Sequence, residues 1–308
     1  MKTPNNFSAT TEQPALIRQA FPQSLRERMV PLIRLLNLPD RLTLAYLLFT
    51  SALLVICQNN IARWPRLLLI HCGLGCTIIT LAAFRERGPQ FIRVLSHWYP
   101  LLLPAFFFEE IGALVHAIFP GWFDDVLIAA DYALFGAHPT VWIEQFSSYW
   151  LTELMQLVYT LYLPLIPAFG AWLWWRGRRA EFTGFVTAMC VAYYLNFLIF
   201  ILFPIEGPHH TLAHLQQVEL AGGPFTAFIN LIEKHGRVHG GAFPSNHVTG
   251  AMVVLFCAFR FSRRTGYALM PLVLSICVAT VYGRYHYGID VLAGTAMARL
   301  GCRIALKE

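Results

Sequence analysis

The sequence predicts an all-α, polytopic integral membrane protein, a bundle of about eight transmembrane helices. Hydrophobic residues make up 56% of the 308 positions and charged residues only 13%, with a mean hydropathy of +0.52. A soluble globular domain carries about 25% charged residues, so this composition excludes an ordinary soluble domain. In addition, apolar runs long enough to cross a bilayer recur along the chain, separated by basic or polar segments.

A membrane-spanning helix needs about 20 mostly apolar residues, or fewer where flanking side chains reach the interface. The predicted spans are residues 42–58, 67–83, 97–119, 151–175, 183–203, 247–261, 267–284 and 289–304. Residues 17–36 precede them and place apolar side chains at helical spacing among arginines. This pattern predicts a basic amphipathic helix lying on the membrane, with a plain surface helix as the alternative.

Basic residues fix the expected orientation, because cytoplasmic loops of membrane proteins carry an excess of Lys and Arg. The basic clusters are Arg18, Arg26, Arg28, Arg34 and Arg41 before the first span; Arg85, Arg87 and Arg93 after the second; Arg176, Arg178 and Arg179 after the fourth; Arg260, Arg263 and Arg264 after the sixth; and Arg299, Arg303 and Lys307 at the end. All fall on one side if both termini are cytoplasmic; Arg63 and Arg66 are the exception. The net charge of +6 therefore indicates topology and not nucleic-acid binding. We expect a bacterial inner-membrane protein.

Two short segments carry the chemistry, residues 243–247 and residues 284–290. Each places a histidine, His247 or His286, at the edge of an apolar stretch, and Asp290 follows His286 by four positions. Both segments fall on the non-cytoplasmic face of the predicted topology. A pair of histidines, one backed by a carboxylate, can attack phosphorus and protonate the leaving group, so we expect neither metal nor cofactor.

The first segment has the features of an oxyanion-binding helix start. Ser245 is a favoured N-cap residue, and the free amides of a first helical turn bind oxyanions. Gly240 and Gly241 allow a close approach of the backbone to a ligand. We expect this turn to hold a phosphate beside His247, against the alternative of an ordinary capped helix with an interfacial histidine.

In the second segment, His286 is the candidate nucleophile. A carboxylate on its other ring nitrogen keeps an imidazole oriented, which is the role expected of Asp290. Arg284 is expected to bind the non-bridging phosphate oxygens. The alternative is a salt bridge between Arg284 and Asp290, with His286 as a bystander.

These two segments resemble the second and third signature motifs of the type-2 phosphatidic acid phosphatase superfamily, which read Pro-Ser-x-His and Ser-Arg-x5-His-x3-Asp. The resemblance covers about residues 203–294 and implies that His286 forms a phosphohistidine, Asp290 orients it and His247 protonates the leaving oxygen. It also implies a core of six helices. The domains are then 1–41, a cytoplasmic tail with the amphipathic helix; 42–95, two additional transmembrane helices; and 96–308, the catalytic domain.

The sequence departs from the family pattern in two places. Thr280 stands where the family has its arginine, and Arg284 lies one turn further along on the same face if the helix is continuous. The first motif, Lys-x6-Arg-Pro, is replaced by the run Phe203-Pro-Ile-Glu-Gly-Pro-His-His. Together with His-Pro-Thr-Val-Trp at 138–142, these departures look more like the inositol phosphorylceramide synthase branch.

Cationic side chains of the 204–246 segment are candidates to replace the missing motif. They are His209, His210, Lys234, His235, Arg237 and His239, with His209 and Arg237 preferred. For each one alone, a solvated loop residue is the alternative. Glu109 and Glu110 interrupt the third span, and intramembrane acids point to function. We expect them to line a headgroup cavity or to pair with a basic site residue; a snorkelling pair is the alternative.

The favoured function is a lipid phosphate phosphatase acting on a phospholipid or a polyisoprenyl phosphate within the membrane. The alternative is transfer of a phospho-headgroup to a lipid hydroxyl, as in inositol phosphorylceramide synthases. A transporter that relays protons through Glu109, Glu110 and the histidines is less favoured, because the histidines gather at one face and not at the midplane. A non-catalytic lipid-binding protein is also less favoured, because His247, His286 and Asp290 are all present.

Overall fold

The computed structural model describes residues 35–306 except 237, and the side chains of 233–236 are not described. Residues 17–34 of the predicted amphipathic helix lie outside the described residues. The chain divides into two units, Met1–Asn37 and Leu38–Glu308, and the second holds the helical bundle.

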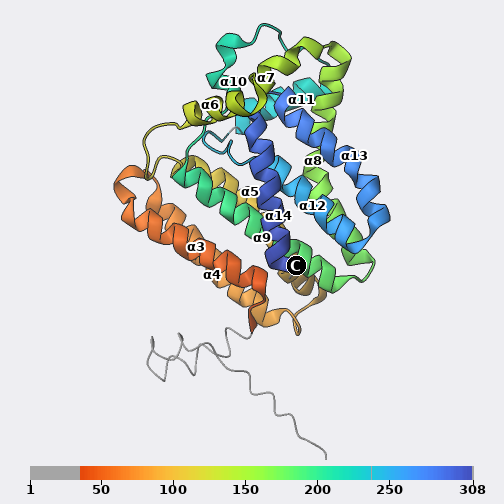
Figure 1. The fold of residues 1–308 in the computed structure, drawn as a ribbon. Helices are drawn as coiled ribbons and strands as arrows, with labels where there is room; N and C mark the ends of the chain where they lie inside the picture. The colour runs from red at the N-terminus through yellow and green to blue at the C-terminus, as the bar shows by residue number, and fades with distance from the viewer. Residues whose placement is uncertain (1–34, 237, 307–308) are drawn as a thin grey trace, which may run out of the picture. The chain divides into compact units, whose positions relative to one another are not determined.

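All eight predicted spans correspond to helices, which confirms the all-α class (Figure 1). They are α3 (Leu38–Ile56), α4 (Trp64–Phe84), α5 (Gln90–Leu114), α8 (Tyr149–Trp175), α9 (Arg179–Leu202), α12 (Asn246–Phe261), α13 (Arg263–Tyr282) and α14 (Gly288–Leu306). The described part of the chain contains no strand and a single parallel β-bridge, between Ile205 and Gly241.

Six of these helices are long and apolar enough to cross a membrane by themselves: α3, α4, α5, α8, α9 and α13. The prediction of eight spans exceeds this number because α12 has only 16 residues and α14 carries the charged residues Asp290, Arg299 and Arg303. Both pack against α9 and against each other, so much of their surface faces protein. A helix inside a bundle does not need the continuous apolar surface that lipid demands.

Helix α9 is the centre of the bundle and contacts α3, α5, α8, α12 and α14. Within its most apolar 18-residue window, 78% of the residues are buried, against 22–44% for the other five candidate spans. The sequence explains this position, because α9 is apolar on every side, and such helices are buried.

The first two helices, α3 and α4, join the bundle through contacts with α5, and α3 also contacts α9. A buried ion pair supports this packing. Arg85 donates to both carboxylate oxygens of Asp40 at 2.8 Å, and Tyr99 donates to Asp40 at 2.7 Å. Because a buried charge is costly without partners, these contacts fix how α3 sits against α5.

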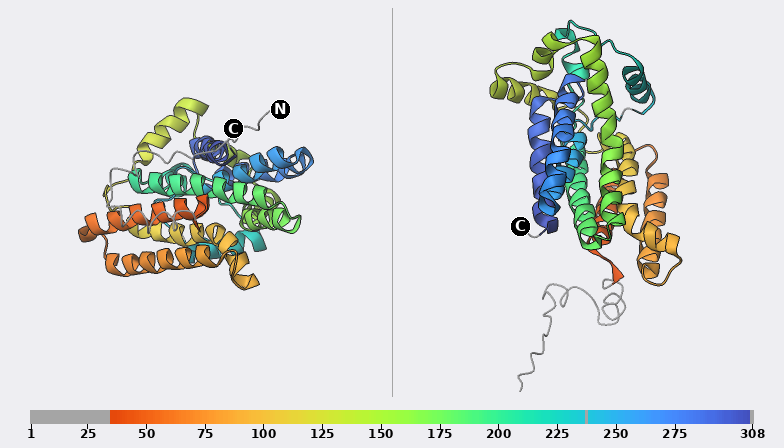
Figure 2. Two further views of the ribbon diagram at one scale, coloured as in Figure 1. Left: turned by 90° about the horizontal axis from the view of Figure 1, so that it is seen from below. Right: turned by 90° about the vertical axis from the view of Figure 1, so that its right-hand side faces the viewer.

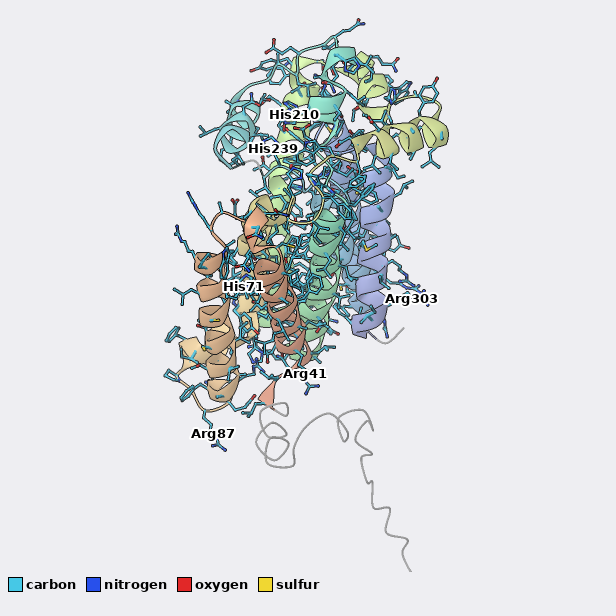
Figure 3. All side chains as sticks on the ribbon, turned by 90° about the vertical axis from the view of Figure 1, so that its left-hand side faces the viewer. Arg41, His71, Arg87, His210, His239 and Arg303 are labelled. Carbon is cyan, nitrogen blue, oxygen red and sulfur yellow. The ribbon has the colours of Figure 1, made fainter. Side chains whose placement is uncertain are left out.

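Short helices gather at one end of the bundle (Figures 1 and 2). They are α6 (Asp124–Phe135), α7 (Pro139–Trp142), η2 (Ile143–Phe146), α10 (Pro208–Thr211), η3 (Ala213–Leu215) and α11 (Pro224–Gly236); η1 (Gln58–Asn60) joins α3 to α4. Figure 3 shows Arg41, Arg87 and Arg303 at the opposite end from His210 and His239. The segment between α5 and α8 and the segment between α9 and α12 carry these short helices, so both lie at the end that lacks these arginines.

Candidate active site

His286 and Asp290 lie together between α13 and α14, with His286 just before α14 and Asp290 in its first turn. The Nδ1 atom of His286 lies 3.2 Å from Asp290 Oδ2 and 2.8 Å from the Ala242 carbonyl oxygen. Both neighbours accept hydrogen bonds, so Nδ1 carries the proton and Nε2 holds the lone pair in the neutral ring. His286 is 5% exposed and Asp290 is fully buried.

The end of α13 sets the position of His286. The amide of Tyr285 donates to the Thr280 carbonyl at 3.0 Å, and the amide of Arg284 donates to the Val281 carbonyl at 3.0 Å. This pattern is a Schellman motif, in which the residue after the helix adopts a left-handed conformation. Arg284 occupies that position with φ 64°, where glycine is the usual residue. The helix therefore ends at Tyr282, and His286 turns back toward the Ala242 loop.

His247 lies in the first turn of α12, beside His286. The two imidazole rings have centroids 5.8 Å apart. Tyr159 stacks on His247 at 4.6 Å and Tyr162 lies at 4.5 Å, so two aromatic rings from α8 hold the histidine in place. The Ser245 hydroxyl accepts from the Val248 amide at 3.2 Å, which confirms the predicted N-cap.

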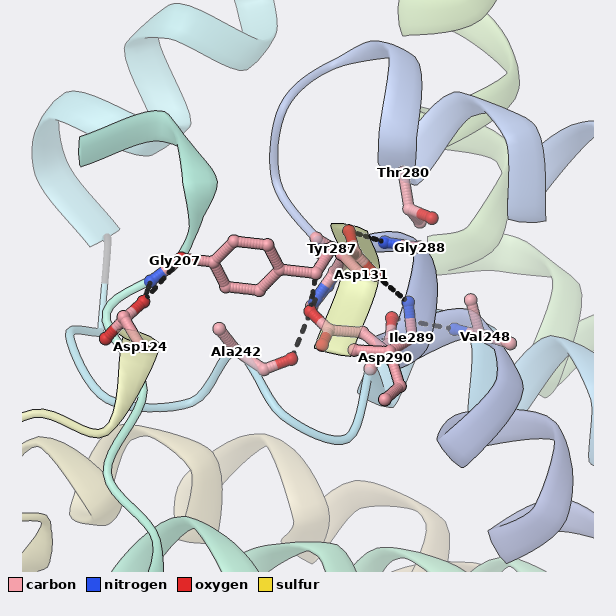
Figure 4. A network of polar contacts seen from close by, with 12 residues as sticks. Asp124, Asp131, Gly207, Ala242, Val248, Thr280, Tyr287, Gly288, Ile289 and Asp290 are labelled. Carbon is pink, nitrogen blue, oxygen red and sulfur yellow. Dashed lines mark hydrogen bonds and ion pairs between the residues drawn. The ribbon is translucent and has the colours of Figure 1, made fainter. Parts of the chain in front are cut away.

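Two carboxylates of α6, Asp124 and Asp131, organise the loops around this pair (Figure 4). Asp131 accepts from the amides of Gly288 and Ile289 at 2.9 and 2.7 Å, at the start of α14. Burial raises the pKa of its carboxyl, and these two amides act in the opposite direction. A carboxylate at a helix N-terminus satisfies free amides and interacts favourably with the helix dipole.

Asp124 ties two loops together. It accepts from the amides of Glu206 and Gly207, both at 2.8 Å, and from the Tyr287 hydroxyl at 2.7 Å. Tyr287 directly follows His286 and is fully buried. Asp124 and Asp131 are not among the site residues predicted from the sequence. Their seven-residue spacing on an apolar helix was the available sign, because it places both on one face.

Among the described residues, Arg284 forms an ion pair with Glu144 and none with Asp290. Its guanidinium lies 3.1 Å from Glu144 Oε2 and donates to the Val218 carbonyl at 2.5 Å. Burial lowers the pKa of the guanidinium, while Glu144 acts in the opposite direction. The continuous helix assumed for Arg284 and Thr280 is absent, because α13 ends at Tyr282. The salt bridge with Asp290 that was the alternative is also absent.

The glycines before α12 approach protein side chains. Gly240 has φ 94°, and a Cβ there would lie 2.0 Å from Val115, the C-cap residue of α5. A Cβ on Gly241 would lie 2.9 Å from Phe108, which is within α5. His209 lies in α10, in the loop that Asp124 holds, and Arg237 lies outside the described residues. The close approach required of Gly240 is therefore to α5.

The two acidic residues of the predicted third span differ in environment. Glu110 is buried in α5, and its carboxylate lies 2.6 Å from His71 Nε2 of α4. His71 Nδ1 lies 2.9 Å from the Ser51 hydroxyl of α3. His71 lies partway along the bundle, away from the end with His210 and His239 (Figure 3). Glu109 is exposed.

Comparison with known proteins places this site in a family. The family described as the PAP2 superfamily matches residues 126–304, more than half of the chain. A PA-phosphatase related-family protein of Dictyostelium discoideum is 26% identical over 113 residues, which cover 35% of this chain. The aligned part is only 20% of that relative's length. No solved structure matches the chain.

The matched residues run from α6 to α14 and include His247, His286 and Asp290. Together with its long apolar helices, this match identifies an integral membrane protein. Nothing in these comparisons separates the inositol phosphorylceramide synthase branch from the others. By the extent of the match and by its helical architecture, this chain belongs to the PAP2 superfamily.

Proposed function

We propose that this protein hydrolyses lipid phosphate monoesters at the membrane surface through a phosphohistidine on His286. The observation that carries the proposal is the environment of the His286 ring. Its Nδ1 faces two acceptors, the Ala242 carbonyl and Asp290, so the lone pair is on Nε2. A neutral imidazole held in one orientation by a buried carboxylate is an activated nucleophile.

In the first step, Nε2 of His286 attacks the phosphorus, and the bond from phosphorus to the lipid oxygen breaks. The leaving oxygen takes a proton from His247, whose ring lies next to that of His286. In the second step, water attacks the phosphohistidine and gives its proton to His247. The phosphorus–nitrogen bond breaks, phosphate leaves, and both histidines return to their starting states.

The phosphate needs cationic or amide donors for its remaining oxygens. The first-turn amides of α12 are suited to this role, because Ser245 caps only the Val248 amide among them. Arg284 is the nearest cation in sequence to His286, and we propose that the substrate phosphate takes the place of Glu144 on it. Gly241 remains a candidate for a further contact because it directly precedes Ala242, which binds His286. His209, in α10, and Arg237 remain candidates as cationic side chains of the 204–246 segment.

A lipid substrate is supported by the place of the site. The site lies at the end of the bundle where the short helices gather (Figure 1). Trp122, Trp142 and Trp150 are 39%, 56% and 80% exposed. Tryptophan is enriched at membrane–water interfaces, so these side chains mark the expected level of lipid headgroups. Glu109 and Glu110 remain candidates for a headgroup cavity, although Glu110 pairs with His71.

The alternative is transfer of the phosphoryl or phospho-headgroup to a lipid hydroxyl. Both reactions share the first step, and only the second acceptor differs. Purified protein in mixed micelles should be given phosphatidic acid and a polyisoprenyl phosphate, with and without diacylglycerol or ceramide as acceptor. Release of inorganic phosphate that is independent of the acceptor lipid supports hydrolysis. A new phospholipid that forms only with the acceptor supports transfer.

The same assay tests the expectation that catalysis needs no metal. The carboxylate among the proposed catalytic side chains is already occupied, because Asp290 bonds His286 and the Tyr287 amide. Activity should persist in excess chelator and be inhibited by vanadate, which mimics five-coordinate phosphorus. Activity that disappears on chelation and returns with magnesium or zinc would contradict the expectation of metal-independent catalysis. His286→Ala serves as the inactive control.

A further inference from the structure

Three side chains that the proposed chemistry does not use gather beside the site: Glu206, His210 and His239. Each offers a ligand atom, and these atoms all lie within 4.8 Å of one another. His239 Nδ1 lies 3.7 Å from Glu206 Oε1, and the rings of His210 and His239 stack with centroids 5.4 Å apart. Figure 3 shows the two histidines close together.

The spacing and the chemistry of this cluster fit a transition metal. Two imidazoles and one carboxylate are a common ligand set for zinc, which leaves a fourth position for water. With metal–ligand distances of about 2.1 Å, tetrahedral ligand atoms lie about 3.4 Å apart. The distance between His239 and Glu206 is already close to that value. Exposed side chains can rotate by the small remaining amount, and His210 and His239 are both exposed.

The backbone beneath the cluster is held in place. A parallel bridge pairs Ile205 with Gly241, so the segment that carries Glu206 runs beside the segment that carries His239. The Glu206 amide donates to Asp124 at 2.8 Å. His210 follows in the short helix α10, where its amide donates to the Gly207 carbonyl at 3.2 Å. A metal would therefore meet ligands whose main chains are already positioned.

A histidine–glutamate pair this exposed contributes little by itself, because solvent screens its charge. The His239 side chain is 53% exposed and that of Glu206 is 26% exposed. The ion pair thus does not account for the convergence of three ligating groups from two loops. A divalent ion would account for this convergence, because coordination bonds to one ion replace the weak contacts and join the two loops.

We propose that Glu206, His210 and His239 bind one divalent transition-metal ion of the zinc class, with water completing the coordination. The metal joins the 203–211 segment to the 238–242 segment, and Ala242 of the latter accepts the His286 hydrogen bond. It is a tether for the loops around the site and takes no part in the attack on phosphorus. The inference does not depend on the proposed function, since the ligands are distinct from His247, His286 and Asp290.

The test uses untagged full-length protein in detergent micelles, freed of metal by chelator and size-exclusion chromatography. Zinc alone is titrated in competition with a chromogenic zinc chelator, and thermal unfolding is followed with and without zinc. The variants are Glu206→Gln, His210→Ala and His239→Ala. The control is His214→Ala, an exposed histidine in η3 of the same segment that is not part of the cluster.

We expect one zinc per chain in the wild type and in the His214 variant, and a rise in unfolding temperature on zinc addition. Loss of a group that only supports a ligand weakens metal binding about 10–100-fold, so loss of a ligand should weaken it at least about 100-fold. The zinc-induced rise in unfolding temperature should disappear with it. Wild-type affinity in all three variants overturns the proposal.

A second measurement does not depend on the variants. Cobalt(II) bound to two imidazoles and a carboxylate shows visible d–d bands without the near-ultraviolet charge-transfer band of a thiolate. We expect that spectrum in the wild type at one cobalt per chain. A strong thiolate band indicates cysteine ligation and overturns the proposal, as does the absence of stoichiometric cobalt binding. Phosphatase activity is recorded in parallel, so failure of this site and failure of the catalytic proposal give separate results.

Discussion

Arg284 holds Glu144 at 3.1 Å while its own backbone lies in the left-handed region, at φ 64°. A residue other than glycine in that region is strained by about 1–3 kcal/mol, and such strain is concentrated at functional sites. Glycine would serve the turn at lower cost. We therefore infer that the arginine side chain has a role that outweighs the backbone cost.

Arg284→Gly separates the side chain from the turn. The variant keeps the Schellman turn and removes the guanidinium, so its unfolding temperature should equal or exceed that of the wild type. If Arg284 binds the substrate phosphate, kcat/KM should fall about 10²–10³-fold, as for loss of one donor to a developing negative charge. Glu144→Gln breaks the ion pair but keeps the guanidinium and should have a much smaller effect. Equal losses in both variants would mean that Arg284 acts only by holding η2 and the 216–218 loop.

Asp124 and Asp125 form a matched pair for testing the support of the site. Asp124 is buried with three donors, and Asp125 is exposed. Asp124→Asn places an amide NH₂ group against one of these donors and should destabilise the protein by about 1–3 kcal/mol. Asp125→Asn should leave the unfolding temperature unchanged. Thermal unfolding in detergent measures both, and an unchanged Asp124 variant would contradict the role given to this carboxylate.

His247 is expected to protonate the leaving oxygen, and the leaving group itself can test this. His247→Ala should reduce turnover of a lipid phosphate by about 10²–10⁴-fold, the usual contribution of a general acid. The leaving group of an aryl phosphate such as p-nitrophenyl phosphate departs as a stable anion without protonation. Turnover of that substrate should therefore fall far less. Equal losses for both substrates would show that His247 acts in binding or folding. The comparison is internal, because one protein preparation serves both assays.

The arginine clusters predict the sidedness of the site. A cysteine at Gln217, placed in a background without native cysteines, should react with a membrane-impermeant thiol reagent added from the periplasmic or lumenal side. A cysteine at Gly177, between Arg176 and Arg178, should not. Basic loops are retained in the cytoplasm, which is the physical reason. The reverse labelling pattern would place the site in the cytoplasm.

The helices could be predicted from the sequence because apolar length and charge are local properties. The burial of α9, for example, follows from its lack of a polar side. The number of spans was harder to predict, because α12 is shorter than the other spans and α14 carries three charged residues, while both pack closely against α9 and against each other. The capping helix α6 gave no clear sign of its position over the site.

The contact between His286 and Asp290 could be predicted because the two residues are four positions apart. The Ala242 carbonyl could not, because it comes from a loop 44 positions away. The predicted position of Arg284 was wrong for a related reason. It assumed a continuous helix, whereas Gly283 and Arg284 form a turn that ends α13 at Tyr282. Contacts of Asp124 and Asp131 depend on tertiary packing of α6, which no local pattern specifies.

Asp290→Asn removes the charge that orients His286 but leaves a side chain of the same shape. We expect weak residual activity, lower by about 10²–10⁴-fold. His286→Ala should abolish turnover entirely while the protein still inserts into membranes and elutes as the wild type on size exclusion. The difference between the two variants distinguishes the nucleophile from its orienting partner.

The most direct test of the account is to trap the phosphoenzyme. Purified protein is mixed with phosphatidic acid labelled with ³²P in its phosphate, and the reaction is stopped in alkali, where phosphohistidine is stable and phosphoserine is not. The account predicts alkali-stable, acid-labile label on the peptide that contains His286, and none in His286→Ala. Label that persists in a folded His286→Ala variant with normal turnover would contradict it.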